Sequence, residues 1–105
     1  MIQVTEETRA GWCIVGVRGR LDAESADELE NALHAAIWKH TKVAADFAAV
    51  DYISSAGLRA VIQAARAAEG RDVEFTICSL KAHVKKVFDM SGLHQILHVQ
   101  GELPC

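Results

Sequence analysis

The sequence predicts a single α/β domain over residues 1–105, with a mixed sheet of four to five strands, parallel crossovers and three to four helices. Three observations carry this prediction. The chain has 105 residues, half of them hydrophobic, which suits one domain with one core. Two strand-like segments come first, separated by a turn-like segment. Segments with helical periodicity then alternate with further strand-like segments, a pattern typical of right-handed crossovers between parallel strands.

The first two strands are expected at residues 1–7 and 11–19. The second segment, GWCIVGVRG, is rich in β-branched and aromatic residues, which favour strands. Residues 8–11, TRAG, have the composition of a turn. We therefore expect an antiparallel hairpin.

A first helix is expected from Ala26 to Trp38. Ser25 followed by Glu28 matches a capping box, in which the serine side chain would accept a hydrogen bond from the first turn. The apolar residues recur at helical spacing and form one stripe. They are Ala26, Leu29, Leu33, Ala36 and Ile37.

The rest of the chain continues the alternation. Residues 42–50 are apolar on both faces apart from Asp46, as in a strand at the middle of a sheet. A second helix is expected from Gly57 to Glu69, a strand at residues 72–79 and a third helix at residues 80–92. The last segment, residues 93–99, fits a helical turn or a short strand equally well.

Composition excludes several classes of protein. The net charge of −3 disfavours a nucleic-acid-binding protein, which usually has a basic excess. No apolar run reaches the roughly 20 residues that span a bilayer, so no membrane insertion is expected, and the N-terminus does not resemble a signal peptide. The three cysteines are odd in number and form no CxxC pair, so we expect neither disulfides nor a metal site. These features suit a cytoplasmic protein.

Motifs of catalysis are also missing from the sequence. It contains no GxxxxGK[ST] phosphate-binding loop, no GxGxxG and no GxSxG nucleophile elbow. His94 and His98 are the one histidine pair at i, i+4 spacing, and no third ligand is nearby in the sequence. We therefore expect no cofactor and no enzymatic activity.

The stretch DYISSAGL, residues 51–58, joins the central strand to the second helix. Ser54 or Ser55 at the N-cap would accept a hydrogen bond from a free backbone N–H and stabilise the helix by about 1 kcal/mol. Ser55 is expected to cap the helix when unmodified. A phosphate on Ser55 would be tolerated there, because free N–H groups and the helix dipole favour negative charge. Phosphorylation would then change the binding of a partner rather than the fold.

Three segments in order, residues 17–33, 43–62 and 75–99, resemble the STAS domain, specifically the bacterial anti-sigma factor antagonists. VRGRLDAESADELENAL resembles the family's strand, G-x-L-D turn and first helix, and VAADFAAVDYISSAGLRAVI its buried strand and D-S-[ST]-G-L signature turn. FTICSLKAHVKKVFDMSGLHQILHV resembles the closing strand, helix and S/T-G-L ending. Two positions depart from the signature: Ser54 replaces the usual aspartate and Ala56 replaces a second serine or threonine.

The resemblance implies a partner-switching mechanism. The unmodified antagonist would bind an anti-sigma factor that is also a serine kinase, and so free a sigma factor. The kinase would phosphorylate Ser55, which falls on the phosphoacceptor of the signature turn, and the complex would dissociate. A PP2C-type phosphatase would reverse the modification. The implied partner-binding residues are Gly19, Leu21, Asp22, Ser54, Ser55, Ala56, Gly57 and Leu58.

An alternative reading stays open at this point. The chain could be a non-catalytic STAS binding subunit of a lipid-transport ABC complex or of a stressosome-like assembly. A serine retained in the signature turn of a single domain favours the regulatory antagonist.

Overall fold

The computed structural model describes residues 2–92 and 98–100, with side chains over residues 2–92. Its elements follow the order strand, strand, helix, strand, helix, strand, helix, strand. They are β1 (Ile2–Arg9), β2 (Trp12–Leu21), α1 (Ala26–Lys39), β3 (Lys42–Ile53), α2 (Ser55–Gly70), β4 (Glu74–Cys78), α3 (Ala82–Met90) and β5 (His98–Gln100). The predicted α/β class, with a mixed sheet and three helices in the described part of the chain, is confirmed.

The five strands form one sheet in the order β1-β2-β3-β4-β5. β1 and β2 are antiparallel, and all later pairs are parallel. The hairpin turn uses Ala10 and Gly11, whose φ angles of 53° and 85° match the left-handed turns that fit the twist of a hairpin. The predicted hairpin and parallel crossovers are therefore both present.

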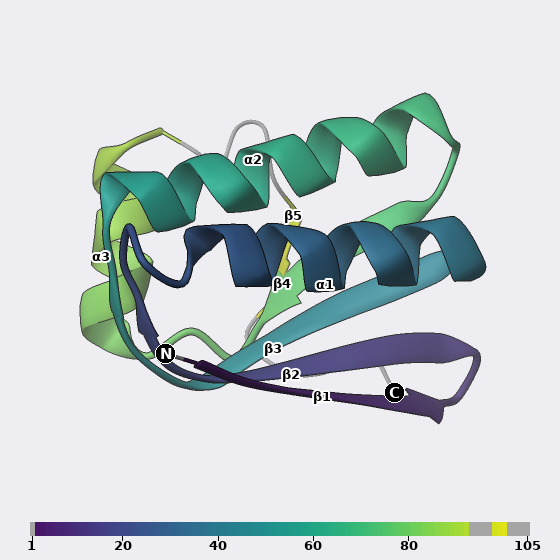
Figure 1. Cartoon of the computed structure of the whole chain (residues 1–105), viewed down its shortest axis with the longest axis horizontal. Coiled ribbons are helices and arrows are strands. Elements are labelled where there is room, and N and C mark those ends of the chain that lie inside the picture. Colours follow the sequence, from purple (N-terminus) through teal and green to yellow (C-terminus); the bar gives the residue numbers. More distant parts are fainter. Residues whose placement is uncertain (1, 93–97, 101–105) are drawn as a thin grey trace.

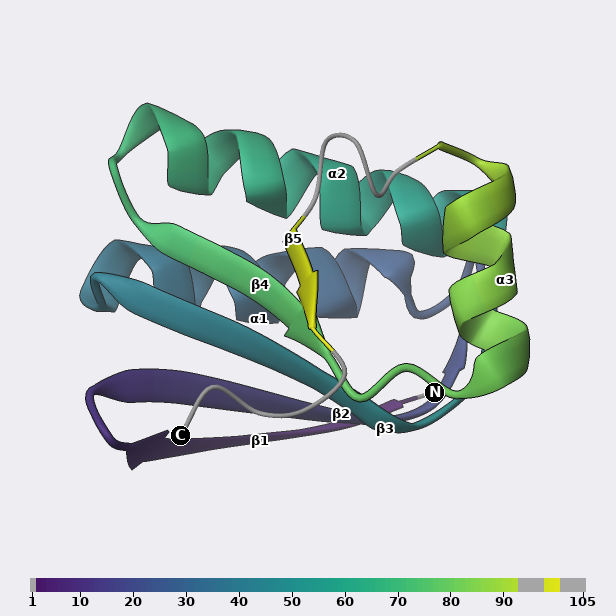
Figure 2. The ribbon, with the colours of Figure 1, turned by 180° about the vertical axis from the view of Figure 1, so that it is seen from behind.

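Helices α1 and α2 lie side by side over one face of the sheet, and α3 stands at one end of it (Figures 1 and 2). The main core fills the space between this helical layer and the sheet. Phe88 of α3 joins it through an edge-to-face contact with Phe47 of β3, with ring centroids 6.5 Å apart. A second, small cluster on the opposite face contains Ile14, Ala44 and Cys78. β3 is thus buried on both faces, as its apolar sequence predicted.

The capping-box prediction for α1 is wrong. Ser25 stands at the N-cap position, but its side chain makes no cap hydrogen bond. Its backbone has φ −100° and ψ −7°, whereas a capping serine usually has an extended backbone that directs its oxygen at the helix. The hydroxyl group is directed instead into the turn that precedes α1, as described below.

Several element boundaries also differ from the sequence prediction by a few residues. α2 begins at Ser55 rather than Gly57, because Ser54 caps it. α3 covers Ala82–Met90, shorter than the expected 80–92. The undecided C-terminal segment contains a short strand, His98–Gln100, and residues 93–97 lie outside the described part.

Candidate functional site

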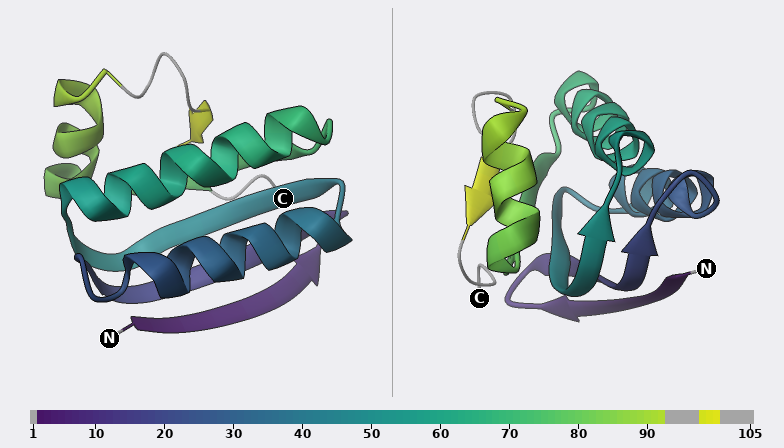
Figure 3. Two further views of the ribbon diagram at one scale, coloured as in Figure 1. Left: turned by 45° about the horizontal axis from the view of Figure 1, so that its top comes forward. Right: turned by 90° about the vertical axis from the view of Figure 1, so that its left-hand side faces the viewer.

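The candidate site lies where β2 and β3 end and α1 and α2 begin. β2 and β3 are parallel neighbours, and their last residues, Leu21 and Ile53, are paired. The N-termini of α1 and α2 therefore lie at the same end of the sheet, as Figure 3 shows, and α3 stands at that end too. Sites in open parallel sheets form beyond the carboxyl ends of the strands. The G-x-L-D turn, residues 19–22, and the S-S-A-G-L turn, residues 54–58, thus lie at the same end of the sheet.

Ser54 is the cap of α2. Its backbone is extended, with φ −97° and ψ 176°, and its hydroxyl oxygen accepts a hydrogen bond from the backbone N–H of Gly57 at 3.3 Å. Its own N–H donates to the carbonyl oxygen of Leu21 at 2.8 Å. Ser54 therefore holds α2 and connects the β3–α2 turn to the end of β2.

Ser55 is the first residue of α2 and is exposed. Its hydroxyl group makes no hydrogen bond with any other residue that the structure describes. The expectation that Ser55 caps the helix when unmodified is wrong, because the extended residue before it already occupies the N-cap. The hydroxyl group of Ser55 therefore has no capping role, although it lies at the positive end of the helix dipole.

Gly57 explains how the start of α2 can lie so close to β2. A β-carbon added at Gly57 would lie 2.9 Å from the carbonyl oxygen of Leu21 and 3.0 Å from its Cβ. It would also lie 2.9 Å from Cγ1 of Ile53. Any side chain here would push α2 away from the sheet, so the glycine of the S-S-A-G-L stretch serves a close approach of two backbones.

The preceding turn, between β2 and α1, is tied together by Ser25 and Asp22. Ser25 is completely buried, and its hydroxyl group donates to the carbonyl oxygen of Arg20 at 2.7 Å and accepts from the N–H of Asp22 at 3.0 Å. One carboxylate oxygen of Asp22 accepts from the N–H groups of Ser25 and Glu24 at 3.2 and 3.1 Å. Desolvation raises the pKa of Asp22, but these backbone hydrogen bonds outweigh it and hold the pKa below its usual value.

Charged and aromatic groups surround the end of β3. The guanidinium group of Arg20 lies over the ring of Tyr52, 4.2 Å from its centroid. Lys81 forms an ion pair with Asp51, and hydrogen bonding and charge from this lysine lower the pKa of the Asp51 carboxyl. His83 contacts the carbonyl oxygen of Asp51 as well. These contacts connect α3 to the strand that leads into Ser54.

The eight residues predicted to bind a partner come together at this end of the sheet, but they differ in exposure. Ser55 is exposed, and Gly19, Asp22, Ser54 and Ala56 are half-buried. Leu21, Gly57 and Leu58 are buried, so they position the surface rather than contact a partner directly. A docking role for any of them stays a prediction.

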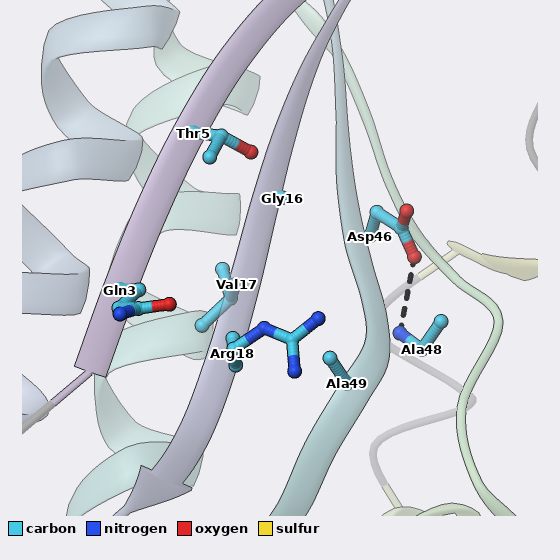
Figure 4. A pocket seen from close by; sticks show the side chains of 8 residues that line it. All are labelled: Gln3, Thr5, Gly16, Val17, Arg18, Asp46, Ala48 and Ala49. Atoms are coloured by element: carbon cyan, nitrogen blue, oxygen red, sulfur yellow. Dashed lines mark hydrogen bonds between the residues drawn. The ribbon is translucent and has the colours of Figure 1, made fainter.

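A groove with a volume of about 320 Å³ lies on the sheet away from this site (Figure 4). Its lining residues come from β1, β2 and β3: Gln3, Thr5, Gly16, Val17, Arg18, Asp46, Ala48 and Ala49. Asp46 accepts a hydrogen bond from the backbone N–H of Ala48 at 3.0 Å, which turns it along its own strand. None of the predicted site residues lines this groove.

Sequence reasoning missed one group of side chains with ligand chemistry: Glu6, Cys13 and His40. They come from β1, from β2 and from the residue after α1. No spacing motif contains them, because only the folding of the hairpin against the end of α1 brings them together. Cys13 itself is buried in β2.

A family model described as the STAS domain matches residues 1–103. BtrV of Bordetella bronchiseptica, a candidate anti-sigma factor antagonist by its name, is 35% identical over 99 residues, which cover 93% of this chain and 85% of BtrV.

Two solved folds are closely similar. An anti-sigma factor antagonist from Mycobacterium paratuberculosis superimposes with a TM-score of 0.89 at 22% identity, over 98% of this chain and 88% of that one. SpoIIAA of Bacillus in its phosphorylated form gives a TM-score of 0.69 at 19% identity, over 95% and 93% of the two chains. At these identities the structures establish the fold alone. Among the residues that our structure describes, no helix is long and apolar enough to cross a membrane.

Proposed function

The chain belongs to the STAS domain family, and on this premise we propose that it is an anti-sigma factor antagonist whose binding is switched off by phosphorylation of Ser55. Unmodified, it binds an anti-sigma factor that is also a serine kinase, and it acts by binding rather than by catalysis. A PP2C-type phosphatase restores the unmodified form. In this proposal the protein acts in the cytoplasm, and residues 1–105 form a single domain.

One observation carries the proposal: the two adjacent serines have separate tasks. The hydroxyl of Ser54 accepts the cap hydrogen bond from Gly57, while that of Ser55 is exposed and has no partner in the described chain. A kinase can therefore reach the Ser55 oxygen without breaking the cap of α2. Ser55 is the position that family resemblance assigns as phosphoacceptor.

The chemistry of the step is simple. The Ser55 Oγ attacks the γ-phosphorus of ATP held by the kinase, its proton passes to a base, and ADP leaves. The product carries about −1.5 to −2 charge at neutral pH. It stands at the first residue of α2, where the helix dipole and free N–H groups favour an anion. The fold is therefore retained, while a partner docked against the turn meets a new charge.

The buried members of the predicted site support this surface from below. The Leu21 carbonyl oxygen holds Ser54, and Gly57 allows α2 to approach Leu21. Asp22 lies in the neighbouring turn, which hydrogen bonds through Ser25 keep rigid. Two adjacent rigid turns provide a docking surface that changes little between the free and bound protein.

The test is phosphorylation by the cognate anti-sigma factor kinase and ATP, with the site mapped by mass spectrometry. We expect one phosphate on Ser55 in the natural protein and in Ser54→Ala, and none in Ser55→Ala. A phosphate on Ser54 in the natural protein would contradict the proposal. Binding of a transporter permease by an unphosphorylated protein that no kinase modifies would favour the alternative, a permanent STAS binding subunit.

A further inference from the structure

Glu6, Cys13 and His40 form a cluster far from Ser55. It lies where α1 ends, at the end of the sheet opposite to that where α1 and α2 begin (Figure 1). One ligand atom of each residue lies within 4.8 Å of those of the other two. Cys13 is buried, His40 is half-buried and Glu6 is exposed. The sulfur of Cys13 therefore lies on the buried side of the cluster, and the carboxylate of Glu6 lies on the side that faces solvent.

The spacing is close to that of ligands around one small cation. Zinc binds sulfur, nitrogen and oxygen at about 2.0–2.3 Å in tetrahedral geometry, which sets its ligand atoms on the order of 3.3–3.8 Å apart. Nε2 of His40 and Oε1 of Glu6 are already 3.4 Å apart. A shift of roughly 1 Å or less, within the reach of side-chain rotation, would bring the widest pair into this range.

The elements that carry the ligands are held by backbone hydrogen bonds. Glu6 and Cys13 lie on the two paired strands of the hairpin. The backbone N–H of His40 donates to the carbonyl oxygen of Ala36 at 3.0 Å, which fixes the end of α1 above them. Ligands on such rigid elements lose little conformational entropy when they bind an ion.

The chemistry of the three side chains also suits a cation. The carboxylate of Glu6 supplies a negative charge beside the thiol of Cys13 and the ring of His40. A divalent ion between them would compensate the carboxylate and displace the thiol proton, so that the sulfur binds as a thiolate.

We propose that Glu6, Cys13 and His40 bind one zinc ion, through the carboxylate, the thiolate and Nε2, with water as the fourth ligand. The mixed sulfur, nitrogen and oxygen set selects zinc over magnesium or calcium, which take oxygen ligands. Three protein ligands and an open position are the pattern of zinc sites that keep a water molecule. The site stands apart from the Ser55 switch and does not depend on it.

The experiment titrates the full-length, untagged, reduced protein with Co²⁺, whose spectrum reports coordination. We expect one equivalent to give near-ultraviolet thiolate-to-cobalt absorption and the strong visible bands of four-coordinate cobalt, and Zn²⁺ to abolish both. Cys13→Ala should remove the thiolate absorption. His40→Ala and Glu6→Gln should weaken metal binding at least about 10–100-fold, since the loss of a residue that only hydrogen-bonds to a metal ligand already weakens binding by that much.

Cys78→Ala and Cys105→Ser are the controls, and both should leave the spectrum unchanged. Cys78 is an equally buried strand cysteine whose apolar cluster lies on the other face of the sheet. If circular dichroism shows that Cys13→Ala does not fold, the test uses His40→Ala instead, because His40 is only half-buried. Zn²⁺ should then raise the melting temperature of the natural protein but not that of His40→Ala. Unchanged binding by Cys13→Ala or His40→Ala, or only the weak bands of six-coordinate cobalt, would overturn the proposal.

Discussion

Two strand-to-helix junctions at the same end of the sheet use serine in opposite ways. At the β2–α1 junction, Ser25 is completely buried, and its hydroxyl group joins Arg20 to Asp22. At the β3–α2 junction, Ser54 caps the helix, and the hydroxyl group of Ser55 is exposed and makes no hydrogen bond with the described residues. The first junction uses its serine entirely for structure. At the second junction, only one of the two serine side chains makes a structural hydrogen bond in the described chain.

The difference shows what makes a residue available for regulation. Modification of Ser25 would break hydrogen bonds that hold the turn and would place a charge in the interior. Modification of Ser55 breaks none in the described structure. Adjacent serines can thus separate the stability of the fold from the regulation of binding.

Gly57→Ala should cause the largest loss of stability, because it disrupts the contact between the two junctions. The new methyl group would meet the backbone carbonyl of Leu21, which cannot rotate away. We expect a loss of about 3 kcal/mol in the free energy of unfolding, measured in urea, at the upper end for overpacked sites. Gly70→Ala is the control, since nothing lies near its added carbon and α2 should gain stability slightly. Equal effects would show that the close approach is unimportant.

Ser25→Ala should cost about 2 kcal/mol, because the carbonyl oxygen of Arg20 and the N–H of Asp22 would lose their partner in a partly buried turn. The same substitution at Ser55 should change stability by less than about 0.5 kcal/mol. Urea unfolding of both variants measures the contrast directly. A large loss for Ser55→Ala would mean that this serine has a structural task after all.

Ser54→Ala should fall between these two, at about 1 kcal/mol, the usual value of an N-cap. The hydrogen bond to Gly57 is long, at 3.3 Å, so a larger loss is not expected. Ser54→Asp is the matched variant, because aspartate also caps helices and should restore stability in urea unfolding. Failure of aspartate to restore it would argue against the cap as the reason.

The smallest effect concerns acid. Asp22 and Asp51 both have lowered pKa values in the folded protein, so each contributes stability that is present above the unfolded pKa of about 3.9 and lost as pH falls through the folded pKa. Backbone N–H groups hold the pKa of Asp22 down, whereas a hydrogen bond from half-buried Lys81 and the charge of this lysine hold the pKa of Asp51 down. In thermal melts between pH 5 and 2, added salt should therefore remove the loss of melting temperature caused by Asp51→Asn. The loss caused by Asp22→Asn should remain in salt.

The order of elements could be predicted because periodicity and turn residues report local preference. The central position of β3 followed from a segment apolar on both faces, and the hairpin from the turn at Ala10 and Gly11. The family resemblance implied that the two turns share one surface, and the parallel pairing of β2 and β3 places both turns at the same end of the sheet. These features depend on short stretches of sequence and on general rules of connection.

Other features depend on contacts between distant residues, and the sequence could not supply them. Ser25 and Glu28 match a capping box, but a helical backbone at Ser25 turns the hydroxyl group toward Arg20. Ser54 rather than Ser55 caps α2 because the backbone of Ser54 is extended. The hydrogen bond from its N–H to the carbonyl oxygen of Leu21 holds this conformation. A local sequence pattern predicts which residue could form a capping hydrogen bond. The tertiary structure decides whether its side chain forms a different hydrogen bond instead.

In the proposed mechanism, Ser55 is the residue that is switched, while its neighbours stabilise the structure. The most direct test measures binding of the unmodified and the enzymatically phosphorylated protein to the anti-sigma factor by calorimetry, with circular dichroism and melting temperature recorded for both. We predict that phosphorylation weakens binding at least about 100-fold, roughly 2.7 kcal/mol, and leaves the fold intact. Equal affinities, or loss of binding only because the phosphorylated protein unfolds, would contradict the account.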